Sequence, residues 1–213
     1  MPADLFPPEL GREEIVDGAV LLRGFAFDRA ETLIGQVEEI AQAAPFRHMV
    51  TPGGFSMSVA MTNCGPAGWV TDRTGYRYDA RDPESGRSWP AMPAVFADIA
   101  ARAANEAGYP DFRPESCLIN RYEPGARMSP HQDRNEHDFG QPIVSVSLGL
   151  PAVFLFGGLK RADRSRRLPL HHGDVVVWGG PSRLRFHGIA PLADGVHPLV
   201  GRCRINLTFR NYS

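Results

Sequence analysis

The chain has 213 residues, of which 43% are hydrophobic and 22% charged, so a largely disordered protein is excluded and one large domain is expected. Its 22 glycines and 19 prolines favour many short strands and turns over a long helical bundle. The net charge of -1 hides a basic stretch at residues 160–187, which indicates either a phosphate-bearing partner or a solvated loop.

The spacing of the cysteines and the hydropathy of the chain indicate where in the cell we expect the protein. The three cysteines are far apart and form no CxxC pair, so neither a zinc knuckle nor a disulfide framework is predicted. The first ten residues contain acids and prolines instead of the apolar region of a signal peptide, and no run approaches 18 apolar residues. We expect a cytoplasmic monomer that makes no contact with membranes.

The N-terminal half is predicted to hold two helices between loops and a few strands. Residues 1–11 are expected to form a flexible arm, and residues 63–90 to form hairpins and loops. Strands are predicted at 19–22 and 55–62. One helix is predicted at 28–43, with Asp28 as its N-cap, and another at 93–107, closed by Gly108.

The C-terminal half changes to short strands separated by turn signals. They are predicted at 117–122, 143–148, 153–156, 175–178, 184–188 and 202–210. This order of elements favours a β-sandwich or jelly roll with helices packed outside.

The last predicted strand alternates strictly between polar and apolar residues. Ile205, Leu207 and Phe209 share the face that must meet a core, while Arg204 and Arg210 share the opposite face with Asn206 and Thr208. That polar face is either exposed to water or lines a cavity that holds an anion. The pattern by itself favours the exposed face.

Two His-x-Asp pairs are candidates for metal binding. In an extended segment, His131 and Asp133 would point to the same side, as the 2-His-1-carboxylate site of iron oxygenases requires. We reject His172 and Asp174 because Gly173 between them is typical of a hairpin turn, where Asp174 would bond local backbone. His187, on the predicted strand 184–188, is the candidate third ligand, although an isolated histidine is more often structural.

Four stretches of sequence carry a resemblance to a known family. They are Met57–Gly65, Cys117–Tyr122, Ile143–Pro151 and His172–Gly180. With the His-x-Asp pair, the distal histidine and the RxNxTxR strand, they make the chain similar, from about Ala19 to Arg210, to the AlkB family of Fe(II)/2-oxoglutarate dioxygenases. The resemblance implies a mainly β (α+β) fold, a double-stranded β-helix or jelly roll with outer helices and an N-terminal nucleotide-recognition lid.

The resemblance also implies roles for individual residues. His131, Asp133 and His187 would hold Fe(II), and Arg210 would act beside them. The residues expected to bind 2-oxoglutarate, with O₂ as the second cosubstrate, are Leu118, Asn120, Tyr122, Ser145, Arg204, Asn206, Thr208 and Arg210. Those expected to contact the substrate are Thr51, Met61, Trp69, Tyr76, Tyr78, Arg134, Asn135 and Arg161.

The resemblance further predicts how the chain is divided and what it recognises. Residues 12–213 would form one dioxygenase domain, in which residues 45–90 make the lid and Trp69 stacks on a flipped base. Asn135 stands where close relatives carry aspartate, which removes an acceptor that would favour a cationic base.

The function implied is repair of alkylated single- or double-stranded DNA, and of RNA, by oxidative demethylation of bases such as 1-methyladenine and 3-methylcytosine. Two alternatives stay open at this point. One is a 2-oxoglutarate dioxygenase that acts on a protein or a small molecule. The other is a non-catalytic jelly-roll module that holds nucleic acid through its basic stretch.

Overall fold

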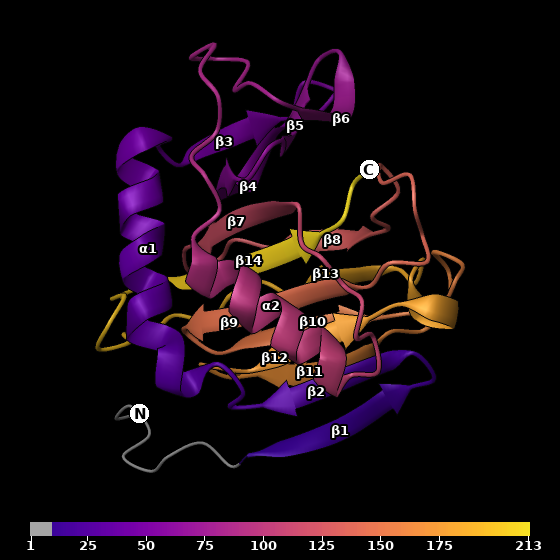
Figure 1. The fold of residues 1–213 in the computed structure, drawn as a ribbon. Helices are drawn as coiled ribbons and strands as arrows, with labels where there is room; N and C mark the ends of the chain where they lie inside the picture. The colour runs from indigo at the N-terminus through magenta and orange to yellow at the C-terminus, as the bar shows by residue number, and fades with distance from the viewer. Residues whose placement is uncertain (1–9) are drawn as a thin grey trace.

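Two antiparallel sheets face each other in the computed structural model, which describes residues 10–213 (Figure 1). Within these residues, the larger sheet has eight strands in the order β1-β2-β12-β9-β14-β7-β4-β3. The smaller sheet has four strands in the order β11-β10-β13-β8, and β5 and β6 form a separate hairpin. This is the predicted β-sandwich of jelly-roll type.

The strands are short, as the turn-rich composition predicts. Those of the larger sheet are β1 (Gly11–Val16), β2 (Ala19–Arg23), β3 (Arg47–Val50), β4 (Ser56–Cys64), β7 (Ser116–Tyr122), β9 (Ile143–Gly149), β12 (Val175–Trp178) and β14 (Arg204–Arg210). Those of the smaller sheet are β8 (Met128–His131), β10 (Ala152–Phe156), β11 (Arg166–Leu170) and β13 (His187–Ile189). The hairpin consists of β5 (Gly68–Asp72) and β6 (Gly75–Asp79).

Two helices cover the outer face of the larger sheet. Helix α1 (Ala30–Ala43) buries Leu33, Val37 and Ile40, which recur at helical spacing, and α2 (Ala94–Glu106) follows Pro93 at its N-cap. Asp28 is not the N-cap that we expected. It lies in a preceding 3-10 turn (η1, Phe27–Arg29), and Arg29 takes the N-cap position without a side-chain hydrogen bond. No helix in residues 10–213 is long and apolar enough to cross a membrane.

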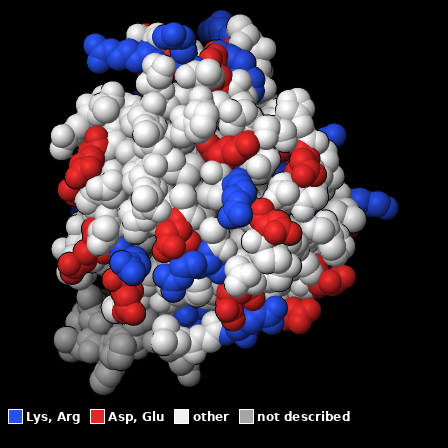
Figure 2. Space-filling view, viewed as in Figure 1, with Lys and Arg blue, Asp and Glu red and all other residues white. Residues whose placement is uncertain are grey.

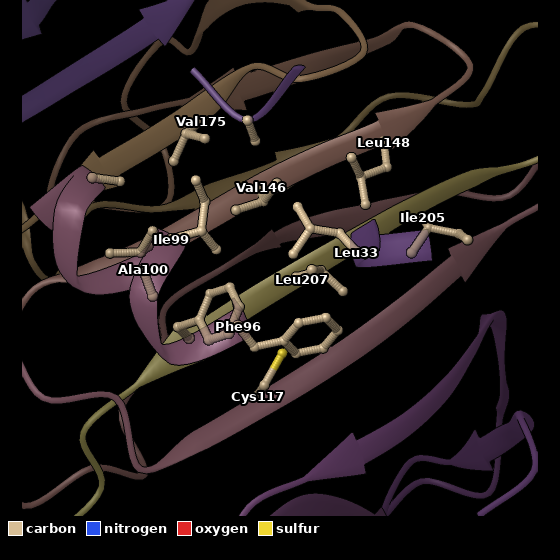
Figure 3. Close-up of a cluster of buried hydrophobic side chains, with 14 of the residues drawn as sticks. Leu33, Phe96, Ile99, Ala100, Cys117, Val146, Leu148, Val175, Ile205 and Leu207 are labelled. Atoms are coloured by element: carbon tan, nitrogen blue, oxygen red, sulfur yellow. The ribbon is translucent and has the colours of Figure 1, made fainter. Parts of the chain in front are cut away.

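The larger sheet has a hydrophobic core on each of its faces. One core lies between the sheet and the helices and contains Phe96, Ile205 and Leu207, and the other lies between the two sheets (Figure 3). Strand β14 therefore turns its apolar residues toward the helices and its polar residues toward the smaller sheet. Arg204, with 1% of its surface exposed, shows that the expectation of a water-exposed polar face is wrong, because the smaller sheet covers it.

Two local expectations near His187 are also corrected. Only His187 and Gly188 of the predicted strand 184–188 are in a strand. The segment before them is a turn that follows a second 3-10 helix (η2, Gly180–Ser182), with Arg185 N–H bonded to the Ser182 carbonyl. His172 to Asp174 is not a hairpin turn, because it connects β11 of the smaller sheet to β12 of the larger one.

Asp174 nevertheless has the structural role that we expected. Its carboxylate accepts hydrogen bonds from the backbone N–H groups of Gly24 and His171 and pairs with Arg23. The aspartate of this second His-x-Asp pair is thus fully occupied in joining two loops. The predicted arm at residues 1–11 lies almost wholly outside the described residues, and Gly11 already begins β1.

Candidate functional site

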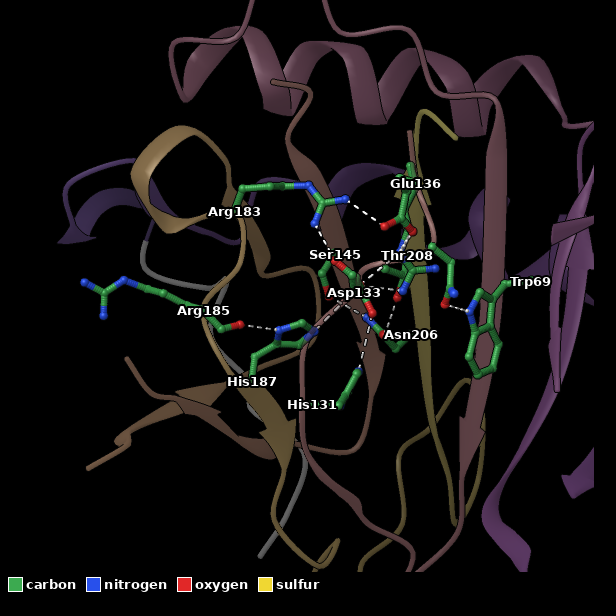
Figure 4. Close-up of polar contacts among 12 residues, drawn as sticks. Trp69, His131, Asp133, Glu136, Ser145, Arg183, Arg185, His187, Asn206 and Thr208 are labelled. Carbon is green, nitrogen blue, oxygen red and sulfur yellow. Dashed lines mark hydrogen bonds and ion pairs between the residues drawn. The ribbon is translucent and has the colours of Figure 1, made fainter. Parts of the chain in front are cut away.

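Three potential metal ligands converge between the two sheets. His131 ends β8, and its direct partner across the sheet is His187, the first residue of β13. Asp133 follows in the loop after β8 and points at both rings (Figure 4). One ligand atom from each of the three residues lies within 4.8 Å of the others. The structure thus brings together the three residues that the sequence pattern singled out.

Backbone carbonyls fix the orientation of both imidazoles. His131 Nδ1 lies 2.9 Å from the Ser129 carbonyl, and His187 Nδ1 lies 3.0 Å from the Arg185 carbonyl. A carbonyl oxygen can only accept, so Nδ1 carries the proton in each ring and Nε2 keeps its lone pair. The two Nε2 atoms lie 3.5 and 3.7 Å from the oxygens of Asp133.

The charge states of these groups at neutral pH suit a cation. Burial is the main cause that lowers the pKa of His187, to about 4, so this ring is neutral. Burial would raise the pKa of Asp133, but the Arg210 guanidinium and the two imidazoles outweigh it and hold this pKa well below its usual range. Two imidazoles and one carboxylate are the donor set of non-haem Fe(II) sites, so the residues fit such an ion.

Arg210 binds the carboxylate instead of standing free in the cavity. Its Nε and Nη2 donate to Asp133 Oδ2 at 3.0 and 2.7 Å. This guanidinium is buried, and its Nη1 has no hydrogen-bond partner among residues 10–213. The ion pair fixes the carboxylate beside the histidines and leaves the Nη1 amino group of Arg210 for a ligand.

A polar cavity opens from the metal ligands toward the larger sheet. All the residues that were expected to bind 2-oxoglutarate line it, namely Leu118, Asn120, Tyr122, Ser145, Arg204, Asn206, Thr208 and Arg210. They come from the neighbouring strands β7, β9 and β14, whose register places Asn206 opposite both Asn120 and Ser147. His131 and His187 line it from the smaller sheet, together with apolar residues such as Met128 and Phe154.

Hydrogen bonds hold the cavity wall in place. Asn206 Nδ2 donates to Ser145 Oγ at 2.8 Å and to the Val146 carbonyl at 2.9 Å, and Thr208 Oγ1 donates to Asn206 Oδ1 at 3.0 Å. Because every one of these side chains is at most 6% exposed, the network is shielded from water and rigid.

Arg204 is the group in this cavity that most clearly calls for a ligand. Its guanidinium lies over the Tyr122 ring, 5.1 Å from the centroid, and its Nη2 donates to Ser147 Oγ at 3.0 Å. Its Nε and Nη1 are buried and have no hydrogen-bond partner among residues 10–213. Burying a guanidinium with two donor nitrogens unpaired costs free energy unless an anion accepts hydrogen bonds from them. A carboxylate has the geometry to accept two parallel hydrogen bonds from a guanidinium.

The hairpin β5–β6 brings aromatic residues to the site. Trp69 and Tyr76 stack on each other with their ring centroids 5.7 Å apart, and Trp69 Nε1 donates to Asn135 Oδ1 at 3.0 Å (Figure 4). Asn135 lies two residues after Asp133 in the same loop. The hairpin is therefore tied to the segment that carries a metal ligand.

Sequence reasoning missed a buried ion pair that supports this tie. Glu136 accepts hydrogen bonds from Tyr78 Oη at 2.6 Å and from Arg183 at 3.0 Å, and it lies 3.5 Å from Arg210. Its only signal in the sequence was an acid close behind the His-x-Asp pair. Arg183 was placed on a strand face with His187, yet it lies in a turn and points to Glu136. Ser147, which bonds Arg204, was also missed, although it lies on the same strand face as Ser145.

The other expected substrate contacts are more scattered. Thr51 lies in the β3–β4 turn, where its Oγ1 accepts from Phe55 N–H, and Arg134 is exposed after β8. Arg161 stacks on Phe186 and donates to the Pro130 carbonyl, close to His131. Met61 has no exposed surface and packs in the core between the sheets, so the geometry does not support its direct contact with a substrate.

Comparison with known proteins agrees with this site. The model of the 2OG-Fe(II) oxygenase superfamily matches residues 18–210. The chain is 61% identical over 208 residues to the alpha-ketoglutarate-dependent dioxygenase AlkB of Escherichia coli, which covers 97% of this chain and 96% of that protein. It is 31% identical over 132 residues to the tRNA demethylase abh1 of Schizosaccharomyces pombe, which covers 61% of this chain and 43% of that protein.

A solved structure shows the same fold. The structure of OsALKBH1 superposes with a TM-score of 0.82 at 28% identity and covers 93% of this chain and 100% of that one. With the donor set and the cavity described above, these matches place the chain in a defined group: it belongs to the 2OG-Fe(II) oxygenase superfamily and, within it, to the AlkB family of alpha-ketoglutarate-dependent dioxygenases.

Proposed function

We propose that this dioxygenase removes N-alkyl groups from bases in nucleic acids by oxidation, releasing the carbon of an N-methyl group as formaldehyde. The single observation that carries the proposal is that the buried Arg204 guanidinium lines one cavity with His131 and His187 of the His131–Asp133–His187 cluster, next to a tethered aromatic hairpin. The names of related proteins add support, since one is called a tRNA demethylase and another a nucleic acid dioxygenase.

His131, Asp133 and His187 would hold Fe(II), and Arg204 would bind the distal carboxylate of 2-oxoglutarate. When bound with 2-oxoglutarate and O₂, the iron supplies the oxidising power that hydroxylates a C–H bond, with succinate and CO₂ as the other products. Arg210 keeps Asp133 ionised, and the two backbone carbonyls keep the imidazoles turned toward the metal. The hydroxylated N-methyl group then breaks down to formaldehyde and the unmodified base.

The lid at residues 45–90 would present the base. Trp69 would stack on a base taken out of the strand, which returns about 1–3 kcal/mol and offsets the cost of unstacking. Asn135 would stand beside the same base, and its amide would replace a carboxylate that favours a positive charge there. Thr51, Tyr76, Tyr78, Arg134 and Arg161 would contact the flanking nucleotide or its backbone.

The test is formaldehyde release from a panel of methylated substrates. The panel holds 1-methyladenine and 3-methylcytosine in single-stranded DNA, double-stranded DNA and RNA, a methylated peptide and free methylated nucleosides. We expect oligonucleotides to give formaldehyde only with Fe(II) and 2-oxoglutarate, and His131→Ala to abolish it. His137→Ala, which changes an exposed histidine close by in the chain, should keep full activity.

Other results would replace the proposal. Formaldehyde from the peptide or the nucleosides alone would assign a protein or small-molecule substrate instead. Binding of oligonucleotides without any 2-oxoglutarate turnover would favour a non-catalytic module. A single domain over residues 12–213, a cytoplasmic location and a monomeric state stay predictions from the sequence.

A further inference from the structure

A second cavity, separate from the dioxygenase site, lies where the connection from β10 to β11 meets β1 of the larger sheet. It has a volume of about 420 Å³, and Phe156, Gly157, Arg164, Arg166 and Arg185 are among the residues that line it. The connection from β10 to β11, residues 157–165, supplies much of its wall, and Val16 of β1 contributes from the larger sheet. None of the residues considered so far as substrate contacts is needed to build it.

The positive charge of the arginines that line this cavity is not balanced by ion pairs. Arg164, Arg166 and Arg185 form no ion pair with any carboxylate among residues 10–213, although eight other arginines of this region do. The one acid in the lining, Asp163, accepts the backbone N–H of Lys160 and so closes its own turn. Three guanidiniums around one cavity favour the binding of an anion, and phosphate is one of the two anions whose geometry the arginine fork matches.

Two of the arginines are held in place by the backbone. Arg185 stacks over Phe156 and donates to the Gly157 carbonyl at 2.8 Å and to Ser182 Oγ at 3.1 Å. Arg166 donates to the Ile15 carbonyl. Figure 4 shows the Arg185 side chain extending away from the metal ligands while its carbonyl faces His187. Arg185 thus contributes its side chain to the cavity, while its backbone carbonyl orients His187 at the metal centre.

The β10–β11 connection links the cavity to Arg161, one of the predicted substrate contacts. Arg161 lies in the same β10–β11 connection and reaches toward Pro130 and Phe186 on the side of His131. Within the turn at 160–163, Asp163 N–H bonds the Lys160 carbonyl, and the chain then leads to Arg164 and Arg166. A nucleic-acid strand that passes Arg161 beside the metal centre would next meet these arginines.

We propose that this arginine cavity binds a backbone phosphate of the nucleic-acid substrate, outside the nucleotide that carries the alkyl group. The inference rests on the proposed function, because it extends the substrate path from that site. Its consequence is that longer oligonucleotides bind more tightly than a trinucleotide, which carries only the phosphates nearest the target base. The contact reads no sequence and depends on salt.

The experiment compares matched pairs of charge removals. Fluorescence anisotropy measures the binding of an unmethylated 12-mer and of a trinucleotide to the wild type and to Arg164→Gln/Arg166→Gln at several salt concentrations. The control, Arg29→Gln/Arg102→Gln, removes the same charge near α1 and on α2, on the face where Figure 2 shows acidic and basic side chains interspersed. Arg164→Glu is a second test variant, because Arg164 is exposed and its reversal removes no ion pair within residues 10–213.

We expect Arg164→Gln/Arg166→Gln to bind the 12-mer about tenfold more weakly and to lower the salt slope by about 1. Trinucleotide binding and turnover should stay within twofold, and the control should match the wild type. Equal 12-mer affinity and slope in the wild type and both test variants would overturn the proposal. It would also fall if inorganic phosphate stabilised only the wild type against heat while 12-mer binding was unchanged, since the cavity would then hold a free anion.

The two proposals fail in different ways. If no substrate gives formaldehyde but the test variants lose 12-mer affinity, the proposed function is wrong and the nucleic-acid contact stands. If methylated oligonucleotides are turned over normally and the variants bind like the wild type, only the cavity proposal is wrong.

Discussion

The wall of the cavity beside the metal-ligand cluster and the predicted lid differ in how they are held. The wall consists of side chains on three paired strands, almost wholly buried and joined by hydrogen bonds to one another. The lid hairpin shows much of its aromatic surface, with Tyr76 47% exposed, and it is tied to the metal-ligand loop through a few side chains. This difference predicts a fixed chemical centre and an adjustable substrate region, because buried networks tolerate change poorly and exposed contacts tolerate it well.

The largest effect is expected at the centre of the rigid region. Asp133→Asn should reduce activity by at least about 100-fold and lower the free energy of unfolding by about 3 kcal/mol, because Arg210 then lacks its buried partner. Chemical denaturation and formaldehyde release measure the two effects. Asp194→Asn makes the same change in an ion pair whose side chains are 63% and 64% exposed, and should cost less than about 0.5 kcal/mol. Equal stability losses would contradict the comparison.

The next effect separates cofactor binding from the metal. Arg204→Gln should raise the KM for 2-oxoglutarate about 100-fold, since two charge-assisted hydrogen bonds to the carboxylate are lost. Thermal stability without ligand should not fall, because the change removes a buried charge that pairs with no carboxylate among residues 10–213. Arg121→Gln, on the same pair of strands but exposed, is the control and should leave this KM unchanged. An unaltered KM in Arg204→Gln would place the keto acid elsewhere.

A smaller effect is expected at the link between lid and centre. Tyr78→Phe removes one hydrogen bond to Glu136, which should cost about 1 kcal/mol of stability and raise the KM for an oligonucleotide a few-fold. Tyr109→Phe removes a comparable bond to the Gly18 carbonyl, far from the lid. It should cost similar stability without changing either KM. The link is refuted if both variants, or neither, alter the KM for the oligonucleotide.

The smallest effect is expected at Asn135, the residue of the loop after β8 that contacts the lid through Trp69. Asn135→Ala removes the acceptor of Trp69 Nε1 and should raise the KM for the oligonucleotide about two- to fivefold. Asn135→Asp keeps that acceptor and adds a charge, so it should restore KM and shift preference toward cationic bases. The ratio of kcat/KM for 1-methyladenine to that for an uncharged methylated base measures this preference. A ratio that does not move would show that residue 135 only orients Trp69.

The sequence predicted interior strands well and edge strands poorly. Strands β7, β9, β12 and β14 were expected within a residue or two of where they lie, because all are buried and apolar on at least one face. The four strands that were not predicted, β1, β3, β8 and β11, are the outermost strands of the two sheets. They carry charges or proline, as in GREEIV and RRLPL, and such residues protect sheet edges but hide the strand pattern.

The residues of the candidate site also differ in how well the sequence predicts them. Residues on β7, β9 and β14 could be predicted because a strand with one apolar face must turn its polar residues to the other side. Glu136 and Arg183 could not, because each lies in an irregular loop and finds its partner only through the tertiary fold. The pattern also could not tell a cavity from solvent at Arg204, since the sheet that covers it is formed by other parts of the chain.

Two donor nitrogens of Arg204 lack a hydrogen-bond partner among residues 10–213. This has a consequence for the stability of the protein before any reaction. A molecule that supplies the missing carboxylate binds the folded chain and not the unfolded one, and so raises the melting temperature with its concentration. Through this thermodynamic linkage, the folded fraction of the protein would rise and fall with the concentration of that carboxylate.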